Sequence, residues 1–83
     1  MITSKDFKNK IVNTKQKEAN YIVETKLAEL LNEKLTTDEI YFTIENCQKD
    51  YIDEINEELV KRGFINIHFG YKDDTIFVYF KIN

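Results

Sequence analysis

The chain has 83 residues, with 12 basic and 15 acidic side chains, no proline or tryptophan, and a single cysteine. A chain of this length is expected to form one domain, 1–83, with a free energy of unfolding of about 4–12 kcal/mol. The lone Cys47 excludes an intramolecular disulfide and fits a reducing compartment. No apolar run approaches the roughly 20 residues that span a bilayer, and the N-terminus lacks a signal pattern, so we expect a cytoplasmic protein.

The net charge of −3 is distributed unevenly along the chain. Residues 1–20 carry five lysines against two acids, residues 21–60 carry three lysines against eleven acids, and residues 61–83 carry four bases against two acids. The acidic middle argues against a general DNA-binding protein, because nonspecific binding depends on cationic side chains that neutralise phosphates.

The first predicted element is a long helix over residues 4–35. Thr3 followed by Asp6 is typical of a capping box at its start. A polar gap at 13–18 contains no glycine or proline, which favours one continuous helix, although a break near Asn13 is the alternative. The helical spacing itself comes from the apolar residues Phe7, Ile11, Val12, Ala19, Ile22, Val23, Leu27, Leu30, Leu31 and Leu35.

A continuous helix of this length would overhang a small sheet. A helix over 4–35 is roughly 48 Å long, whereas a strand of seven residues is only about 24 Å long. We therefore expect residues 1–16 to project as an arm or, if the helix breaks, to fold back. The arm carries Phe7, Ile11 and Val12, and we favour their burial against a second copy of the chain in a C₂ homodimer.

A strand and a second helix are predicted next. Strict alternation of apolar and polar residues over 39–45 is typical of a half-buried strand. The apolar spacing that follows predicts a helix over 47–62, with Asn46 as its N-cap. Gly63 stands where a left-handed residue ends such a helix.

Two more strands complete a β-α-β-β order. Ile65, Ile67 and Phe69 alternate on one face of the first, and a polar stretch at 71–74 can supply the turn. The last strand, over 76–82, is apolar on both faces and is therefore expected in the middle of the sheet. The sequence predicts an α+β fold whose three-stranded antiparallel sheet has the order 2-3-1. Its predicted core residues are Ile40, Phe42, Ile44, Ile55, Leu59, Ile67, Val78 and Phe80.

The sequence contains no recognisable catalytic constellation. It has no Gly-rich phosphate loop and no paired Cys or His for a metal, so we expect a non-catalytic protein without metal or cofactor. Cys47, at the first turn of the second helix, can have a thiol pKa lowered by the helix dipole, but we favour a half-buried structural residue. His68 is expected to be solvated in an edge strand.

The first candidate site is the acidic side of the helix over 47–62. Carboxylates on neighbouring turns can imitate a line of phosphates and occupy the nucleic-acid-binding surface of another protein, as a DNA mimic does. A solvated helix face, favoured by the macrodipole, is the alternative. The predicted partner-binding residues are Asp50, Asp53, Glu54, Glu57 and Glu58.

The second candidate site is the other face of the sheet, where Tyr41, Phe77 and Tyr79 are expected near Asn66 and His68. Aromatic side chains on a sheet can stack unpaired bases. They can equally be covered by the long helix or by a protein partner, which is the interpretation that we favour because few basic residues lie nearby.

A long charged N-terminal helix, the segment Glu39–Ile44, and the segment Ile55–Phe64 leading into a hairpin make the chain similar to small accessory proteins of phages of low-GC bacteria. The resemblance covers most of the chain and assigns no residue roles. It implies a protein that binds and redirects a host protein. We expect a regulatory or inhibitory protein-binding protein, with a nucleic-acid or nucleotide binder that uses the aromatic face and the Lys-rich arm as the alternative.

Overall fold

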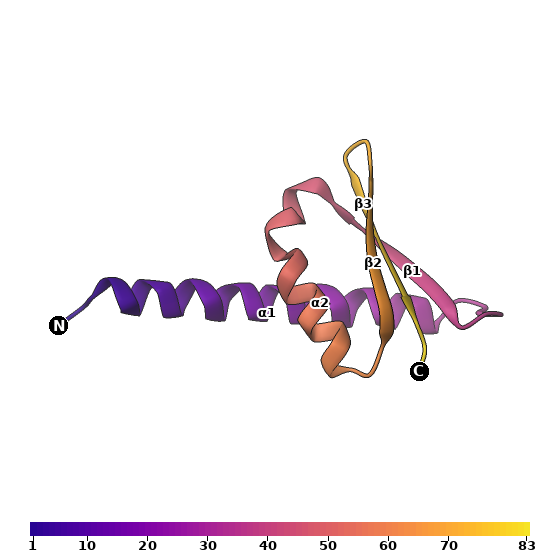
Figure 1. Ribbon diagram of the computed structural model, residues 1–83, viewed down its shortest axis with the longest axis horizontal. Helices are drawn as coiled ribbons and strands as arrows, with labels where there is room; N and C mark the ends of the chain where they lie inside the picture. The colour runs from indigo at the N-terminus through magenta and orange to yellow at the C-terminus, as the bar shows by residue number, and fades with distance from the viewer.

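The computed structural model describes residues 1–83. A long helix projects beyond the rest of the molecule, and a second helix crosses it beside a small twisted sheet (Figure 1). The predicted α+β class is confirmed. The elements in chain order are α1 (Ser4–Leu31), β1 (Glu39–Glu45), the 3₁₀ helix η1 (Asn46–Tyr51), α2 (Ile52–Lys61), β2 (Ile65–Lys72) and β3 (Thr75–Lys81).

The helix α1 is continuous, with no break near Asn13. Its capping box is formed as predicted, and the backbone N–H of Thr3 donates to Asp6 Oδ2 at 2.8 Å. The predicted end at Leu35 is wrong, because α1 ends at Leu31. Asn32 closes the helix there: its side-chain Nδ2 donates to the carbonyl oxygen of Ala28 at 3.3 Å, which satisfies one of the last free carbonyls.

The second helical segment differs from the prediction at its start. Residues 46–51 form a 3₁₀ helix, and α-helical geometry begins only at Ile52. The N-cap is Glu45, whose backbone N–H donates to Gln48 Oε1 at 2.9 Å. Asn46 has another role, because its N–H donates to the carbonyl oxygen of Asp74 at 2.9 Å and ties η1 to the turn between β2 and β3.

The end of α2 confirms the role predicted for Gly63, which has a φ of 90°. The N–H of Gly63 donates to Val60 O at 3.0 Å, and the N–H of Phe64 donates to Leu59 O at 3.1 Å. These two bonds form a Schellman motif. The ring of Phe64 then packs edge-on against Phe80, with centroids 4.8 Å apart, so the helix end is joined to the core.

The sheet has the order β1-β3-β2, with β3 antiparallel to both neighbours, as predicted. One prediction on β2 is wrong. Asn66 adopts a φ of 52°, and the register slips between Ile65 and His68. Because of this bulge Ile65 lies opposite Lys81, is exposed, and does not share a face with Ile67.

One hydrophobic core lies between the helices and one face of the sheet. Ile40 and Ile67 were predicted as core residues, but both lie on edge strands and are only partly buried against the core. The core includes Ile76 and four residues from the C-terminal half of α1. The buried residues are Ala19, Ile22, Val23, Leu30, Phe42, Ile44, Ile55, Leu59, Ile76, Val78 and Phe80.

The N-terminal part of α1 takes no part in this core. Every residue from Met1 to Thr14 is exposed, and α1 extends well past α2 and the sheet (Figure 1). This part of α1 therefore overhangs the sheet. We refer to residues 1–16 as the arm.

Candidate functional site

Three aromatic side chains pack together on the sheet face that points away from the helices. The ring of Tyr41 lies 6.1 Å from that of Phe77 and 5.6 Å from that of Tyr79, measured between centroids. Phe77 and Tyr79 are stacked, with centroids 6.0 Å apart. We call these three residues the aromatic cluster, and this side of the sheet the open face.

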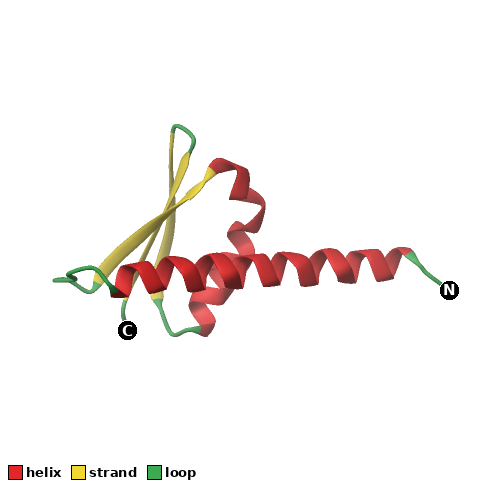
Figure 2. Ribbon diagram, turned by 180° about the vertical axis from the view of Figure 1, so that it is seen from behind, coloured by secondary structure: helices red, strands yellow, loops and turns green.

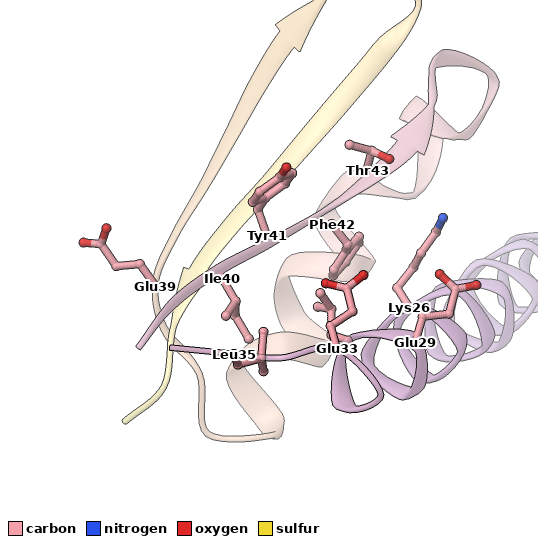
Figure 3. A pocket seen from close by; sticks show the side chains of 10 residues that line it. Lys26, Glu29, Glu33, Leu35, Glu39, Ile40, Tyr41, Phe42 and Thr43 are labelled. Carbon is pink, nitrogen blue, oxygen red and sulfur yellow. The ribbon is translucent and has the colours of Figure 1, made fainter. Parts of the chain in front are cut away.

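Strand alternation and register create the cluster. Tyr41 on β1 is the register partner of Tyr79 on the central strand β3, so the two share one face. Their chain neighbours point the other way: Ile40 and Phe42 turn toward the helices while Tyr41 turns outward (Figure 3). The sequence predicted this grouping correctly, because it follows from alternation once the strand order is known.

Neither helix covers the aromatic cluster. Tyr41 is 53% exposed and Tyr79 is 43% exposed, whereas their neighbours Phe42 and Phe80 are buried. Phe77, the third ring of the cluster, is partly buried. The proposal that α1 covers these aromatics is therefore wrong: α1 packs on the opposite side, with α2 and the core.

The open face carries little net charge. The amine of Lys81 lies 3.4 Å from a carboxylate oxygen of Glu39, so these two charges compensate. By the strand register the face also holds one further cation, Lys72, and one further anion, Glu45. His68, the register partner of Tyr79, is exposed as predicted. The face is thus aromatic and close to neutral.

The acidic helix face is smaller than the sequence indicated. Asp50, Asp53 and Glu57 are exposed, but Glu54 and Glu58 are partly buried. Glu58 accepts a hydrogen bond at 3.3 Å from Nε of Arg62 and lies 3.8 Å from the amine of Lys61. The structure therefore leaves three free carboxylates, which we call the acidic stripe.

The apolar residues of the arm are open to solvent. Phe7 is 62% exposed, Ile11 is 56% exposed and Val12 is 51% exposed. Phe7 and Ile11 border a shallow hollow of about 350 Å³ whose other wall includes Tyr51 of η1. The alternative partner-binding residues thus form two separate surfaces, the arm and the aromatic cluster, and the structure does not bring them together.

A groove between the end of α1 and the edge strand β1 was not predicted. Its volume is about 350 Å³, and Leu30, Leu35 and Ile40 contribute apolar surface (Figure 3). Glu29 and Glu33 give it an acidic rim. No sequence signal marks this groove, because it depends on the path of the connection between α1 and β1.

Cys47 differs from the predictions in both its thiol pKa and its burial. Its Sγ donates to Glu45 Oε2 at 3.4 Å, and this hydrogen bond to a carboxylate raises the pKa of the thiol above its ordinary value. The suggested lowering by the helix dipole is therefore wrong. Cys47 is also exposed and not half-buried.

Two further features bear on the chemistry. The structure holds no group of three or more His, Cys, Asp or Glu side chains placed to bind a metal ion together. None of its helices combines the length and the apolar character needed to cross a membrane.

Comparison of the chain with protein-family models, with curated proteins and with solved structures finds no match.

Proposed function

We propose that this is a small, non-catalytic regulatory or inhibitory protein that acts as a homodimer and binds another protein through the open face of its sheet. The observation that carries the proposal is the aromatic cluster, in which three rings are packed on one another and left uncovered by both helices. Aromatic side chains are enriched in protein interfaces and dominate their binding energy.

Leaving the aromatic cluster exposed is unfavourable for the isolated chain. Exposed ring surface forfeits roughly 25 cal/mol for each Å² that could be buried. Because the three rings already contact one another, their side chains lose little entropy when a partner covers them. A preorganised apolar patch is therefore well suited to binding.

The charge on the open face indicates the chemistry of the partner. Lys81 is paired with Glu39, which leaves the aromatic cluster in nearly neutral surroundings. A partner surface that is apolar and uncharged suits this face best, because a charged group buried there would find no counter-charge.

Direct binding of nucleic acid is the alternative, and the same rings support it because bases stack on aromatic side chains. Two features weigh against it. The open face has no excess of cations to neutralise phosphates. The Lys-rich arm projects at the other end of the molecule from the sheet, so the arm and the cluster do not form one binding track (Figure 1).

The acidic stripe supports a second docking surface that imitates nucleic acid. This second proposal is supported by the exposure of Asp50, Asp53 and Glu57 on successive turns of η1 and α2. Replacing these three residues with Asn, Asn and Gln removes the charge while preserving side-chain size. Loss of binding at low salt with an unchanged fold would assign the stripe a docking role, and unchanged affinity would leave it a solvated helix face.

Site-resolved photo-crosslinking tests the proposed function. The photoreactive residue p-benzoylphenylalanine, placed at position 41 or 79 in the full chain expressed in its source organism, should form an adduct with one other protein. Tyr71 provides the matched control. It is an exposed tyrosine of the same sheet, but it lies opposite the buried Ile76 near the hairpin end.

The products distinguish the possible roles of the open face. A protein adduct from positions 41 and 79, absent from position 71, is the expected result. A nuclease-sensitive adduct would favour the nucleic-acid alternative, and an adduct of two copies of this chain would assign the face to self-association. Adducts of equal yield at all three positions, or none at 41 and 79, would overturn the proposal.

A further inference from the structure

A regular row of exposed residues runs along α1, and its first members, Phe7, Ile11 and Thr14, also border the hollow beside Tyr51 of η1. Its members follow one another at alternating spacings of four and three residues, which is the spacing of the seam positions in a left-handed coiled coil. Thr14, Glu18 and Thr25 make this seam partly polar. Seen from behind, α1 lies in front of α2 and the sheet, and no other element passes over it (Figure 2). The row consists of Phe7, Ile11, Thr14, Glu18, Tyr21, Thr25 and Ala28, all of them exposed.

The charges of α1 run against the helix dipole. Its first half, residues 4–17, carries five lysines against one acid, and its second half, residues 18–31, carries one lysine against three acids. Cations near the N-terminus and anions near the C-terminus both oppose the macrodipole. An antiparallel neighbouring helix with the same sequence would compensate this arrangement, because its acidic half would lie beside the basic half.

We propose that two copies of the chain pair antiparallel through this row of α1, with Thr14 of one copy facing Thr25 of the other. In the same register Ile11 faces the small Ala28, and Glu18 faces Tyr21, whose hydroxyl can donate to the carboxylate. This inference names the interface of the proposed homodimer and rests on that part of the proposed function. It leaves the open face of each sheet free.

Charge complementarity selects this register among antiparallel alternatives. It places Lys8 beside Glu29 of the second copy and Lys17 beside Glu24 of the second copy, whose carboxylate also binds Arg62 of its own chain. Each pair occurs twice by symmetry. Shifting the helices by one heptad, so that Ile11 faces Tyr21, would instead place Lys17 beside its own symmetry mate. The arm then lies along the C-terminal half of the second α1, where Lys10 can cover the exposed Leu31.

Disulfide trapping tests the direction and register of the helices. The native Cys47 is exposed and is first replaced by Ser. Two chains are then made, one with Thr14→Cys and one with Thr25→Cys. Under mild oxidation each alone should remain uncrosslinked, whereas a mixture of the two should give a covalent dimer. Crosslinking of each variant with itself would indicate a parallel pair, and no crosslink in the mixture would overturn the register.

A charge exchange tests the pairing without cysteine. Lys8→Glu or Glu29→Lys alone places like charges together twice and should weaken the dimer roughly fivefold in sedimentation equilibrium. The double variant should restore the wild-type affinity. Lys5→Glu is the control, because it makes the same charge change in the arm away from the facing positions. An acid near the N-terminus is favoured by the dipole, so fraying of the helix would not explain a loss with Lys8→Glu.

The oligomeric state of the unmodified chain completes the test. Light scattering after gel filtration should give twice the mass of one chain, and deletion of residues 1–16 should give a monomer that retains the buried core. A full-length chain that stays monomeric at millimolar concentration would overturn the inference. That result would not affect the open face, whose test by photo-crosslinking requires no second copy. Conversely, failure of the open face to bind a partner would leave the measured dimer intact.

Discussion

The guanidinium of Arg62, at the end of α2, donates a hydrogen bond to the carboxylate of Glu24 on α1. The same side chain donates to Asn20 Oδ1 at 2.7 Å and to Glu58 Oε1 at 3.3 Å. Partial burial alone would lower the pKa of Arg62, but the bonds to Glu24 and Glu58 outweigh this and raise it. One arginine therefore links the two helices where they cross.

Replacing Arg62 with Met should lower the free energy of unfolding by about 1–2 kcal/mol, because three hydrogen bonds are lost and Glu58 is left partly buried without its partner. Urea denaturation followed by circular dichroism measures the change. The control is Lys61→Met, which removes a 3.8 Å ion pair of a largely exposed lysine and should cost less than about 0.5 kcal/mol. Equal losses for both variants would show that the helix contact does not depend on Arg62.

Truncation of a core side chain should lower the free energy of unfolding by more than the loss of Arg62. Leu59→Ala or Phe80→Ala should each cost about 2–5 kcal/mol, because both side chains are almost fully buried and the space they leave cannot collapse completely. Val60→Ala is the neighbouring control on the exposed side of α2. Thermal and urea unfolding give the values. Losses below about 0.5 kcal/mol at both core sites would contradict the assignment of faces.

The elements that depend on local pattern could be predicted from the sequence. Alternation over 39–45 gives β1 with its observed bounds, and Gly63 marks the end of α2. The doubly apolar last strand predicts its central place in the sheet. The aromatic cluster follows from these features, because it needs only alternation and strand order.

The errors arise where a single side chain redirects the backbone. The amide of Gln48 competes for the N–H of Glu45 and moves the N-cap, and the left-handed Asn66 inserts a bulge that moves Ile65 to the exposed side. Burial of Glu54 and Glu58 could not be predicted either, because it depends on where α2 crosses α1. The N-cap and the bulge are local backbone features, whereas the burial of the two glutamates is set by tertiary packing. None of them leaves a periodic signal.

The two glycines offer a matched pair of substitutions. Gly63→Ala should destabilise the protein by about 1 kcal/mol, because its φ of 90° is strained for a residue with a Cβ. Gly70→Ala should have a much smaller effect, since its Cβ would meet the ring of Tyr79 at 3.5 Å and Cβ of Phe77 at 4.0 Å, both ordinary contacts. Denaturant midpoints measure both variants. A larger loss at Gly70 would indicate that the aromatic cluster is packed more tightly against β2 than the structure shows.

Cys47 gives a prediction about pH. Because hydrogen bonding to Glu45 raises the pKa of the thiol, the reactive thiolate should appear at higher pH in the folded protein than in the unfolded chain. The stabilisation of the folded protein by this hydrogen bond is present below the unfolded pKa of about 8.5, and it is lost as the pH rises through the folded pKa. The rate of alkylation by iodoacetamide as a function of pH measures the shift. Glu45→Gln should move the profile to lower pH, and an unchanged profile would contradict the assigned cause.

The dependence of partner affinity on salt shows whether the open face binds through its aromatic cluster, once the protein captured at Tyr41 and Tyr79 has been purified. Binding through a neutral aromatic face should change the Kd by less than roughly threefold between low and physiological salt, because few charges are neutralised at the interface. The double variant Tyr41→Ser, Tyr79→Ser should abolish binding at every salt concentration. A hundredfold or steeper loss of affinity with salt is expected of phosphate contacts and would contradict the account, as would undiminished binding by the double variant.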